Sequence, residues 1–250
     1  MDSSPPLASD VAAIVIGRNE GARLTGCLTA LAPQVARIVY VDSGSTDGSP
    51  AAAEALGAEV VALDMSRPFT AARARNAGVD RLRTGGLPRY IQFVDGDCAL
   101  DPSWIGTARA ALEANPTLAV VCGRRRERFP EASIYNRMID REWDTPIGPA
   151  RACGGDALFR AEALEAVGGY NPTLIAGEEP ELCFRLRAAG WGVERLDAEM
   201  TLHDAALTRF GQWWQRTRRG GHAFAEGAFL HGNSPERYYV RETLRALVWG

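Results

Sequence analysis

The stretch Tyr90-Ile-Gln-Phe-Val-Asp-Gly-Asp97 joins a mostly apolar run to two aspartates that are separated by one glycine. A short apolar run is typical of a strand that is buried on both faces of a parallel sheet. Patterns typical of helices separate it from similar runs upstream, at Val11–Ile16, Arg37–Asp42 and Ala58–Leu63. We therefore expect an α/β fold with an open, mostly parallel, Rossmann-like sheet and right-handed crossovers.

Polar side chains follow the carboxyl ends of three of these strands, namely Asn19, Asp42 and the pair Asp95 and Asp97. Ligands of open α/β sheets bind beyond these ends, which predicts a binding site there. Two carboxylates on one turn can converge on a divalent cation, and their oxygens suit Mn²⁺ or Mg²⁺. Solvated turns carry the same pattern, so the two aspartates alone leave a structural role open.

The alternation of strands and helices becomes irregular after residue 100. The pattern predicts helices over 104–114 and 133–143, a strand over 118–123 before the basic run Arg124–Arg128, and a short strand over Met200–His203. Pro180 suits the first position of a further helix, which Gly190 would end. From Ala205 onward we expect one or two amphipathic helices.

Composition excludes several classes of protein. All 28 basic residues are arginine, so there is no lysine to bind phosphate in a Walker motif or to form a Schiff base. The formal net charge of −3 disfavours a nucleic-acid partner. The 5 cysteines include no CxxC pair, which disfavours a zinc site and favours the reducing cytoplasm. The sequence shows neither a signal-peptide pattern nor an apolar run long enough to span a membrane.

Several polar residues have two interpretations at this point. Glu178 and Glu179 stand at a predicted helix start, where acidic residues commonly interact with the helix dipole, but where one of them could also act as a general base. His203 closes a predicted strand and is either structural or a metal ligand. Arg75 lies on a polar helix expected over about residues 70–81, whose surface could simply be solvated.

Five segments occur together in an order found in a known family, and they are Val15–Glu20, Val41–Ser49, Ala74–Gly78, Phe93–Asp97 and Gly177–Leu182. With Gly154-Gly155 and Val167–Tyr170 between them, they make the chain resemble the family 2 glycosyltransferases of the GT-A fold, from about Ala12 to Glu226. The resemblance implies an inverting enzyme that takes one sugar from a nucleoside diphosphate sugar. It also implies a bound Mn²⁺ or Mg²⁺ ion.

The resemblance implies donor-binding roles for several residues. Glu20 and Asp42 match contacts to the base and ribose of the nucleotide. Arg75 matches an arginine near the base or the diphosphate. Arg216 and Arg219 lie further along the chain and are expected beside the diphosphate as well.

The resemblance also implies a metal site and a general base. Asp95 is similar to the first aspartate of the family's DxD motif, which meets the ribose or a metal-bound water, and Asp97 to the direct metal ligand. His203 matches a histidine that some members use as a further ligand. Glu179 occupies the position of the base, where the family usually has Asp; its longer side chain leaves Glu178 as an alternative.

Two features concern the acceptor. The glycine-rich stretch Gly154-Gly155-Asp156 is expected to bind it. Processive members carry Gln-x-x-Arg-Trp, whereas this chain has Gln212-Trp-Trp-Gln-Arg216, so we expect a single sugar addition.

We expect three segments: a nucleotide-sugar-binding half over residues 1–98, an acceptor-binding and catalytic half of the same domain over 99–204, and an amphipathic helical segment over 205–250. The last segment carries seven arginines and three glutamates, so it either contacts an anionic membrane surface or packs on the catalytic core. The apolar ending Leu247–Gly250 also leads us to expect a longer, membrane-anchored parent protein.

Together these expectations describe a metal-dependent hexosyltransferase of the cytoplasm, at the inner face of the cell membrane, that serves cell-surface glycan or glycolipid synthesis. Its acceptor would be a glycan or a lipid-linked sugar. One alternative is a sugar-nucleotide nucleotidyltransferase, but such enzymes carry a glycine-rich loop with a basic residue after the first strand, and the segment Ile16–Glu20 does not supply it. The other alternative is a non-catalytic nucleotide-binding scaffold. A dehydrogenase is disfavoured because no G-x-G-x-x-G follows the first strand.

Overall fold

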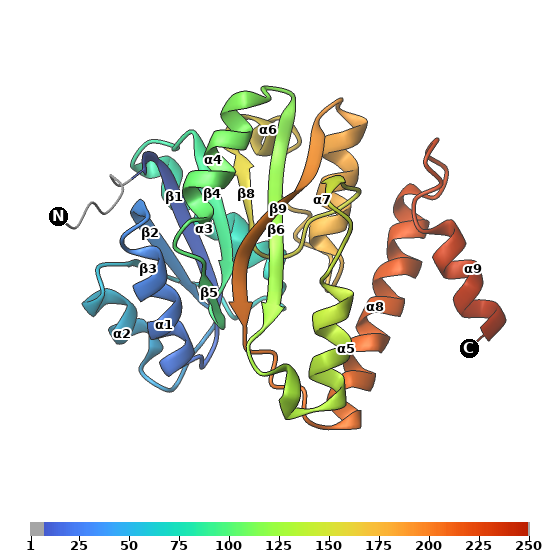
Figure 1. Ribbon diagram of the computed structural model, residues 1–250, viewed down its shortest axis with the longest axis horizontal. Coiled ribbons are helices and arrows are strands. Elements are labelled where there is room, and N and C mark those ends of the chain that lie inside the picture. Colours follow the sequence, from blue (N-terminus) through green and yellow to red (C-terminus); the bar gives the residue numbers. More distant parts are fainter. Residues whose placement is uncertain (1–7, 250) are drawn as a thin grey trace.

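The computed structural model describes residues 8–249, and the strands of these residues form one mixed sheet (Figure 1). The strands are β1 (Ala8–Gly17), β2 (Val35–Asp42), β3 (Glu59–Ala62), β4 (Tyr90–Asp95), β5 (Cys98–Leu100), β6 (Leu118–Glu127), β7 (Gly148–Pro149), β8 (Ala157–Arg160) and β9 (Gly192–His203). Their order across the sheet is β3-β2-β1-β4-β8-β6-β9-β5, and β7 pairs with β9 off this path. The expected α/β class is confirmed.

The first four strands in the sheet order form its parallel half. β1 lies between β2 and β4 and is parallel to both, and β3 is parallel to β2. The side chains from Val11 to Ile16 are buried, as expected for a strand covered on both faces. Gly17 pairs with Asp42 and Ile16 with Asp95, so this register brings both aspartates to one edge of the sheet.

The second half of the sheet differs from the sequence-based expectation. β8 is antiparallel to both β4 and β6, and its four residues had given no recognisable strand pattern. β6 continues through Glu127, so the strand end expected at residue 123 is wrong. The strand expected over Met200–His203 is also too short, because β9 is 12 residues long. Apolar and polar residues alternate from Leu196 to His203, which is the pattern of a half-buried strand and was the signal for its greater length.

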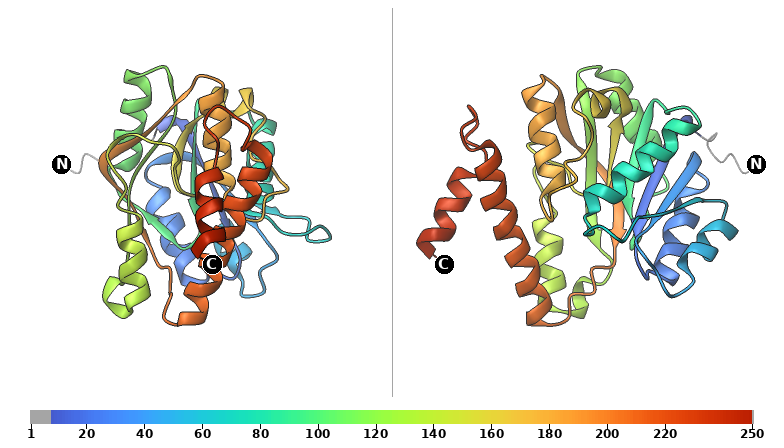
Figure 2. Two further views of the ribbon diagram at one scale, coloured as in Figure 1. Left: turned by 90° about the vertical axis from the view of Figure 1, so that its right-hand side faces the viewer. Right: turned by 180° about the vertical axis from the view of Figure 1, so that it is seen from behind.

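Helices cover both faces of the sheet. α1 (Ala22–Leu31) and α2 (Ser49–Ala55) lie on one face of the parallel half, and α3 (Ala71–Thr84) lies on the other (Figures 1 and 2). Thr70 caps α3 by accepting a hydrogen bond from the Arg73 backbone N–H. The remaining helical elements of the body are α4 (Trp104–Ala114), the 3₁₀ turn η1 (Pro130–Ala132), α5 (Ile134–Glu142), α6 (Ala161–Ala166) and α7 (Glu178–Ala188).

α7 begins at Glu178, the predicted helix start, but Pro180 has a different position in the helix from the one expected. Gly177, with a φ of 78°, is the N-cap, and Glu178 is the first helical residue. Pro180 is therefore the third residue rather than the first, a position where its missing N–H still costs no intrahelical hydrogen bond. As a result, Glu178 and Glu179 both lie in the first turn, at the positive end of the helix dipole.

The C-terminal part forms a two-helix arm beside the body, made of α8 (Phe210–His231) and α9 (Val240–Trp249) (Figures 1 and 2). Within residues 8–249, no helix is long and apolar enough to cross a membrane. The sheet runs through both expected halves, and the division after residue 98 falls inside β5. Gly250, the last residue of the apolar ending considered above, lies outside the described residues.

Gly78 permits the close packing of α3 on β1. A Cβ atom at this position would overlap Ile14 Cγ2 and lie 3.1 Å from Ile14 Cγ1. We expect Gly78→Ala to lower the free energy of unfolding by about 1–3 kcal/mol, because a well-packed core cannot shift to accept the methyl group. Denaturant unfolding followed by circular dichroism measures this change.

Gly106→Ala in α4 is the matched control, since a Cβ there meets nothing within 4 Å. This substitution should leave the stability unchanged or raise it by up to about 1 kcal/mol, because alanine favours helices. Equal losses in the two variants would contradict the packing described for Gly78.

Candidate active site

The turn after β2 is built around the Asp42 carboxylate. Asp42 Oδ2 accepts hydrogen bonds from the backbone N–H groups of Gly44 at 3.0 Å and Ser45 at 2.9 Å. Asn19 braces the same turn by accepting a hydrogen bond from the Thr46 N–H at 2.7 Å. Asp42 is buried, so its carboxylate shapes a loop of backbone groups at the carboxyl edge of the sheet. This edge is the side on which a nucleotide was expected.

Glu20 lies beside the Asp95-Gly96-Asp97 turn. A Cβ at Gly96 would lie 3.2 Å from Glu20 Cγ, so the two segments are in direct contact. Burial raises the pKa of Glu20, and its ion pair with Arg23 at 2.6 Å opposes that shift. Glu20 is thus close enough to the aspartates to share a ligand with them.

Arg75 joins three acidic side chains that the sequence separates. Its Nη2 lies 2.9 Å from Asp95 Oδ1, and its Nη1 lies 3.0 Å from Glu178 Oε1 and 2.8 Å from Glu179 Oε1. The Arg75 side chain is only 3% exposed, so it is held by these carboxylates rather than free to bind a diphosphate. The structure therefore brings the expected metal turn and the expected base to one guanidinium.

Glu179 has an unusual protonation equilibrium. Burial raises the pKa of its carboxyl to about 7; Arg75 opposes this shift, and the negative charges of Glu178 and Asp95 add to it. A carboxylate with a pKa near neutrality can both accept a proton and release it at physiological pH. Among the described residues, this property and its position make Glu179 the strongest candidate for a base.

Asp97 and His203 form a second pair at the same turn. His203 Nε2 lies 3.0 Å from Asp97 Oδ2, because β5 and β9 pair Cys98 with His203. Burial of Asp97 opposes ionisation, but the hydrogen bond from His203 lowers its pKa. The Cys98 sulfur lies close by, but a soft sulfur ligand does not suit Mn²⁺ or Mg²⁺, so it is a poor ligand for these ions.

The donor atoms at this turn fit a divalent cation. Asp97 offers a carboxylate oxygen and His203 an imidazole nitrogen, and both residues line one pocket. The Nδ1 atom of His203 is buried and has no hydrogen-bond partner among the described residues. An oxygen and nitrogen set suits Mn²⁺, which accepts imidazole more readily than Mg²⁺ does. Asp95 is turned toward Arg75 instead, at 2.9 Å, which favours Asp97 over Asp95 as the direct ligand.

One face of α8 closes the pocket over Asp97 and His203. This pocket has a volume of about 470 Å³, and α8 contributes Gln212, Gln215, Arg216 and Arg219 to it. Arg216 also forms a bidentate ion pair with Glu142 at 2.6 and 2.9 Å, which fixes its position beside the pocket. The structure thus brings Arg216 and Arg219 to the side of the site where a diphosphate was expected.

Asp156 does not have the position expected of an acceptor ligand. Its side chain is 0% exposed, and its Oδ1 accepts a hydrogen bond from the Asp95 backbone N–H at 3.0 Å. Its Oδ2 accepts a hydrogen bond from the Thr201 hydroxyl at 2.9 Å and pairs with Arg125 at 2.8 Å. In this structure Asp156 is therefore buried against the Asp95 turn and holds it in position, because the buried strand β8 begins at the next residue.

Arg125 is a site residue that the sequence analysis missed. Its guanidinium lies 3.8 Å from Asp95 Oδ2 and stacks over the ring of Trp143, whose centroid is 5.4 Å away. Trp143 in turn packs against the His203 ring at 4.8 Å. The basic run directly continues a buried apolar strand, and this continuation was the signal that could have placed Arg125 inside.

Gly155 lets the backbone of the glycine-rich stretch pass directly against the ion pair between Arg75 and Asp95. A Cβ at Gly155 would lie 2.6 Å from Arg75 Nη2 and 2.7 Å from Asp95 Oδ2, so no other residue fits without displacing them. Its neighbour Gly154 is exposed. Of the three expected acceptor residues, only Gly154 therefore has an exposed position beside the site.

The fold and the site together define a GT-A glycosyltransferase, with acidic residues at the carboxyl edge of the parallel half-sheet and a carboxylate opposite them. The sequence profile of glycosyl transferase family 2 matches residues 12–168, and the chain belongs to this family. It is a glycosyltransferase that uses nucleotide sugars, which removes the nucleotidyltransferase and dehydrogenase alternatives.

Named relatives support this class. The succinoglycan biosynthesis protein ExoA of Rhizobium meliloti is 27% identical over 228 residues, which cover 85% of this chain and 69% of that protein. The pre-mycofactocin glycosyltransferase of Mycobacterium tuberculosis is 25% identical over 242 residues, covering 91% of this chain and 49% of the relative. The chain thus spans about half the length of this second relative.

A solved structure shows the same fold. The mannosyltransferase PcManGT of Pyrobaculum calidifontis, solved in complex with GDP-Man and Mn²⁺, is 20% identical and has a TM-score of 0.63. The match covers 96% of this chain and 69% of that one. The GT-A architecture expected from the sequence is therefore confirmed.

We expect Gly155→Ala to disrupt the site without unfolding the protein. The new methyl group would push Arg75 and Asp95 apart, and a misplacement of about 1 Å can reduce catalysis by about 100-fold. The measurement is release of nucleoside diphosphate from a panel of nucleotide sugars with Mn²⁺, together with the melting temperature.

Gly154→Ala is the control, since a Cβ there would lie 3.5 Å from Arg125 Nη2, an ordinary contact. Release of nucleoside diphosphate by Gly155→Ala at the wild-type rate would show that the close approach is unimportant.

Proposed function

We propose that the protein is an inverting glycosyltransferase that moves a single sugar from a nucleoside diphosphate sugar to an acceptor hydroxyl. One observation carries this proposal: Arg75 holds both the Asp95 turn, where the donor is expected, and Glu179, a carboxylate with a pKa of about 7. A donor-binding edge and a proton acceptor at neutral pH are the two parts that a direct displacement needs.

In the proposed reaction, Glu179 accepts the proton of the acceptor hydroxyl while the acceptor oxygen bonds to the anomeric carbon. The bond from that carbon to the diphosphate breaks, and the electron pair leaves with the diphosphate. Attack from the side opposite the leaving group inverts the configuration. We assign the base to Glu179 rather than Glu178. Glu178 lies 3.0 Å from Arg75 and shares this guanidinium with Asp95 and Glu179.

Asp97 and His203 would hold a divalent cation, Mn²⁺ or Mg²⁺, with Asp95 beside them. When bound, such an ion neutralises charge on a departing diphosphate. Arg216 and Arg219 line the same pocket and would bind the diphosphate oxygens, while Glu20 and the loop around Asp42 would bind the nucleoside.

The proposed acceptor is a glycan or a lipid-linked sugar, reached beside Gly154, in cell-surface glycan or glycolipid synthesis. The name of the succinoglycan biosynthesis relative supports a role in polysaccharide synthesis. We propose that the enzyme acts in the cytoplasm at the inner face of the cell membrane, with contact through residues 205–250. The departure from Gln-x-x-Arg-Trp at Gln212–Arg216 supports a single addition rather than processive synthesis.

We expect Glu179→Gln to reduce sugar transfer by about 10²–10⁴-fold, because an amide cannot accept the proton. Affinity for the nucleotide sugar should stay within a few-fold of wild type, since the amide keeps the shape of the side chain. Transfer to a screened acceptor and calorimetric titration of the donor measure the two quantities.

Glu178→Gln is the matched control and should retain most of the transfer activity. In the wild type, kcat/KM should fall about tenfold per pH unit below about pH 7, because the base must be ionised, and it should level off above that pH. The assignment is wrong if this acidic limb persists unchanged in residual activity of Glu179→Gln.

Asp97→Ala should remove the effect of Mn²⁺ on nucleotide binding. The wild type should bind nucleoside diphosphate more tightly with Mn²⁺ than with a chelator, because the cation links the carboxylate to the phosphates. Thermal shift with the nucleotide, with and without Mn²⁺, is the measurement. A Mn²⁺-dependent shift of the same size in Asp97→Ala would assign the cation to other residues.

A further inference from the structure

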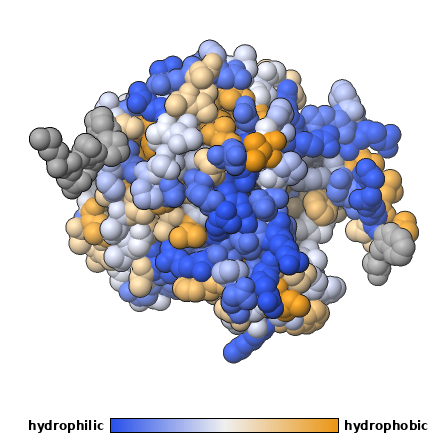
Figure 3. Space-filling view, in the orientation of Figure 1, coloured by the Kyte–Doolittle hydropathy of each residue, from blue (hydrophilic) through white to orange (hydrophobic). Residues whose placement is uncertain are grey.

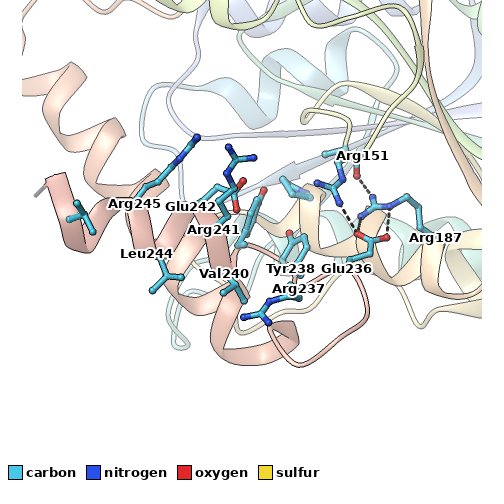
Figure 4. A pocket seen from close by; sticks show the side chains of 14 residues that line it. Arg151, Arg187, Glu236, Arg237, Tyr238, Val240, Arg241, Glu242, Leu244 and Arg245 are labelled. Atoms are coloured by element: carbon cyan, nitrogen blue, oxygen red, sulfur yellow. Dashed lines mark hydrogen bonds and ion pairs between the residues drawn. The ribbon is translucent and has the colours of Figure 1, made fainter.

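A second large cavity lies outside the proposed active site. It is a groove of about 710 Å³ between the helical arm and the body (Figure 4). α9 and the turn that precedes it form one wall. Arg187 and Pro180 of α7, with Arg151 and Ala152 before the glycine-rich stretch, form the other.

The arm is anchored on the helix that carries Glu179. A Cβ at Gly177, the N-cap of α7, would lie 2.8 Å from Ala223 Cβ of α8, so the two elements are in close contact. Further along, His231 Nε2 lies 2.9 Å from Glu181 Oε1. The Tyr238 ring is buried and packs on Phe184 at 4.8 Å. The groove therefore has a fixed position relative to the proposed base.

The charges of the groove are unbalanced. Glu236 is neutralised, because it pairs with Arg187 at 2.7 Å and Arg151 at 3.8 Å, as the dashed lines in Figure 4 show. Arg237, Arg241 and Arg245 also line the groove, and they form no ion pair with any residue that the structure describes. Glu242 is the remaining acidic group of the lining. An occupant should therefore be anionic.

An apolar stripe runs beside these arginines. Val240, Leu244 and Val248 are four residues apart on α9 and line the groove; Leu244 is 55% exposed and Val248 76%. Figure 4 shows Arg241 and Arg245 pointing to one side of the helix and Leu244 to another, and Figure 3 shows hydrophilic and hydrophobic residues side by side on the arm.

This combination fits an amphiphile better than a nucleic acid or a soluble phosphate. Basic and apolar stripes that adjoin on one helix are suited to the boundary between lipid headgroups and acyl chains. The groove also reaches the acceptor side of the site, since Pro180 directly follows Glu179 and Ala152 stands two residues before Gly154.

We propose that this groove binds the phosphate headgroup of an anionic lipid at a bilayer surface. Arg237, Arg241 and Arg245 contact the phosphate, and the apolar stripe of α9 contacts the first acyl carbons. The arm thereby binds the enzyme to the membrane in an orientation that places the end of the groove at the bilayer surface. The further consequence, that a lipid-linked acceptor reaches Glu179 along this surface, rests on the function proposed above.

Vesicle co-sedimentation of the full chain tests the proposal. The wild type should bind vesicles of equal parts phosphatidylglycerol and phosphatidylcholine, and not vesicles of phosphatidylcholine alone. The double variant Arg241→Gln, Arg245→Gln should bind the anionic vesicles about 30-fold more weakly, since each arginine near such a surface contributes about fivefold. Leu244→Gln should also weaken binding, which separates a lipid from a free phosphate.

Arg67→Gln, Arg141→Gln is the matched control, because both arginines are exposed, lie outside residues 205–250 and do not line the groove. Its vesicle binding should stay within about twofold of wild type, and both double variants should keep the wild-type melting temperature. Equal binding to neutral and anionic vesicles, an equal loss in the control, or binding of the wild type to a DNA oligonucleotide but not to vesicles would overturn the proposal. Binding is measured without a nucleotide sugar, so a failure of the transfer reaction leaves this test intact.

Discussion

The site depends on one buried guanidinium, that of Arg75. Arg75 is almost fully removed from solvent, and three carboxylates from two distant parts of the chain surround it. A buried guanidinium is stable only when acidic partners compensate for the water that it has lost, and each acidic partner in turn depends on the guanidinium. Arg75 therefore fixes the distance between the Asp95 turn and the start of α7, and with it the distance between the donor edge and Glu179.

A second set of contacts, made by Asp156 and Arg125, also holds the Asp95 turn in position. Asp156, the residue before β8, accepts a hydrogen bond from the Asp95 N–H and is itself neutralised by Arg125. Arg125 stacks on Trp143, and Trp143 packs on His203, so a continuous set of contacts joins the back of the turn to the candidate metal ligands. These residues never need to touch a substrate in order to matter, because they determine where Asp95 and His203 point.

The helical arm connects this site to the outer surface of the molecule. α8 presents Arg216 and Arg219 to the pocket over Asp97 along its first half, and its second half packs on α7 through Ala223 and His231. α9 then turns back along α8, and its arginines line the second groove. One hairpin thus lies next to both the expected diphosphate and the expected acceptor entrance, which gives the C-terminal segment a role in the architecture of the site.

The sequence by itself determined the parallel half of the sheet, its flanking helices and the family, because buried strands and amphipathic helices leave local patterns of apolar residues. It also indicated Asp95, Asp97, Glu179 and His203 as candidates, since the family motifs are short and contiguous. Only the tertiary structure decided how they meet. Arg75 and Glu178 are 103 residues apart, and their pairing follows from the docking of α7 on the sheet, which no local pattern encodes. The same reason explains why the sequence did not indicate the burial of Asp156 and Arg125: burial of a charged side chain depends on partners from distant parts of the chain, here Asp95 and Thr201.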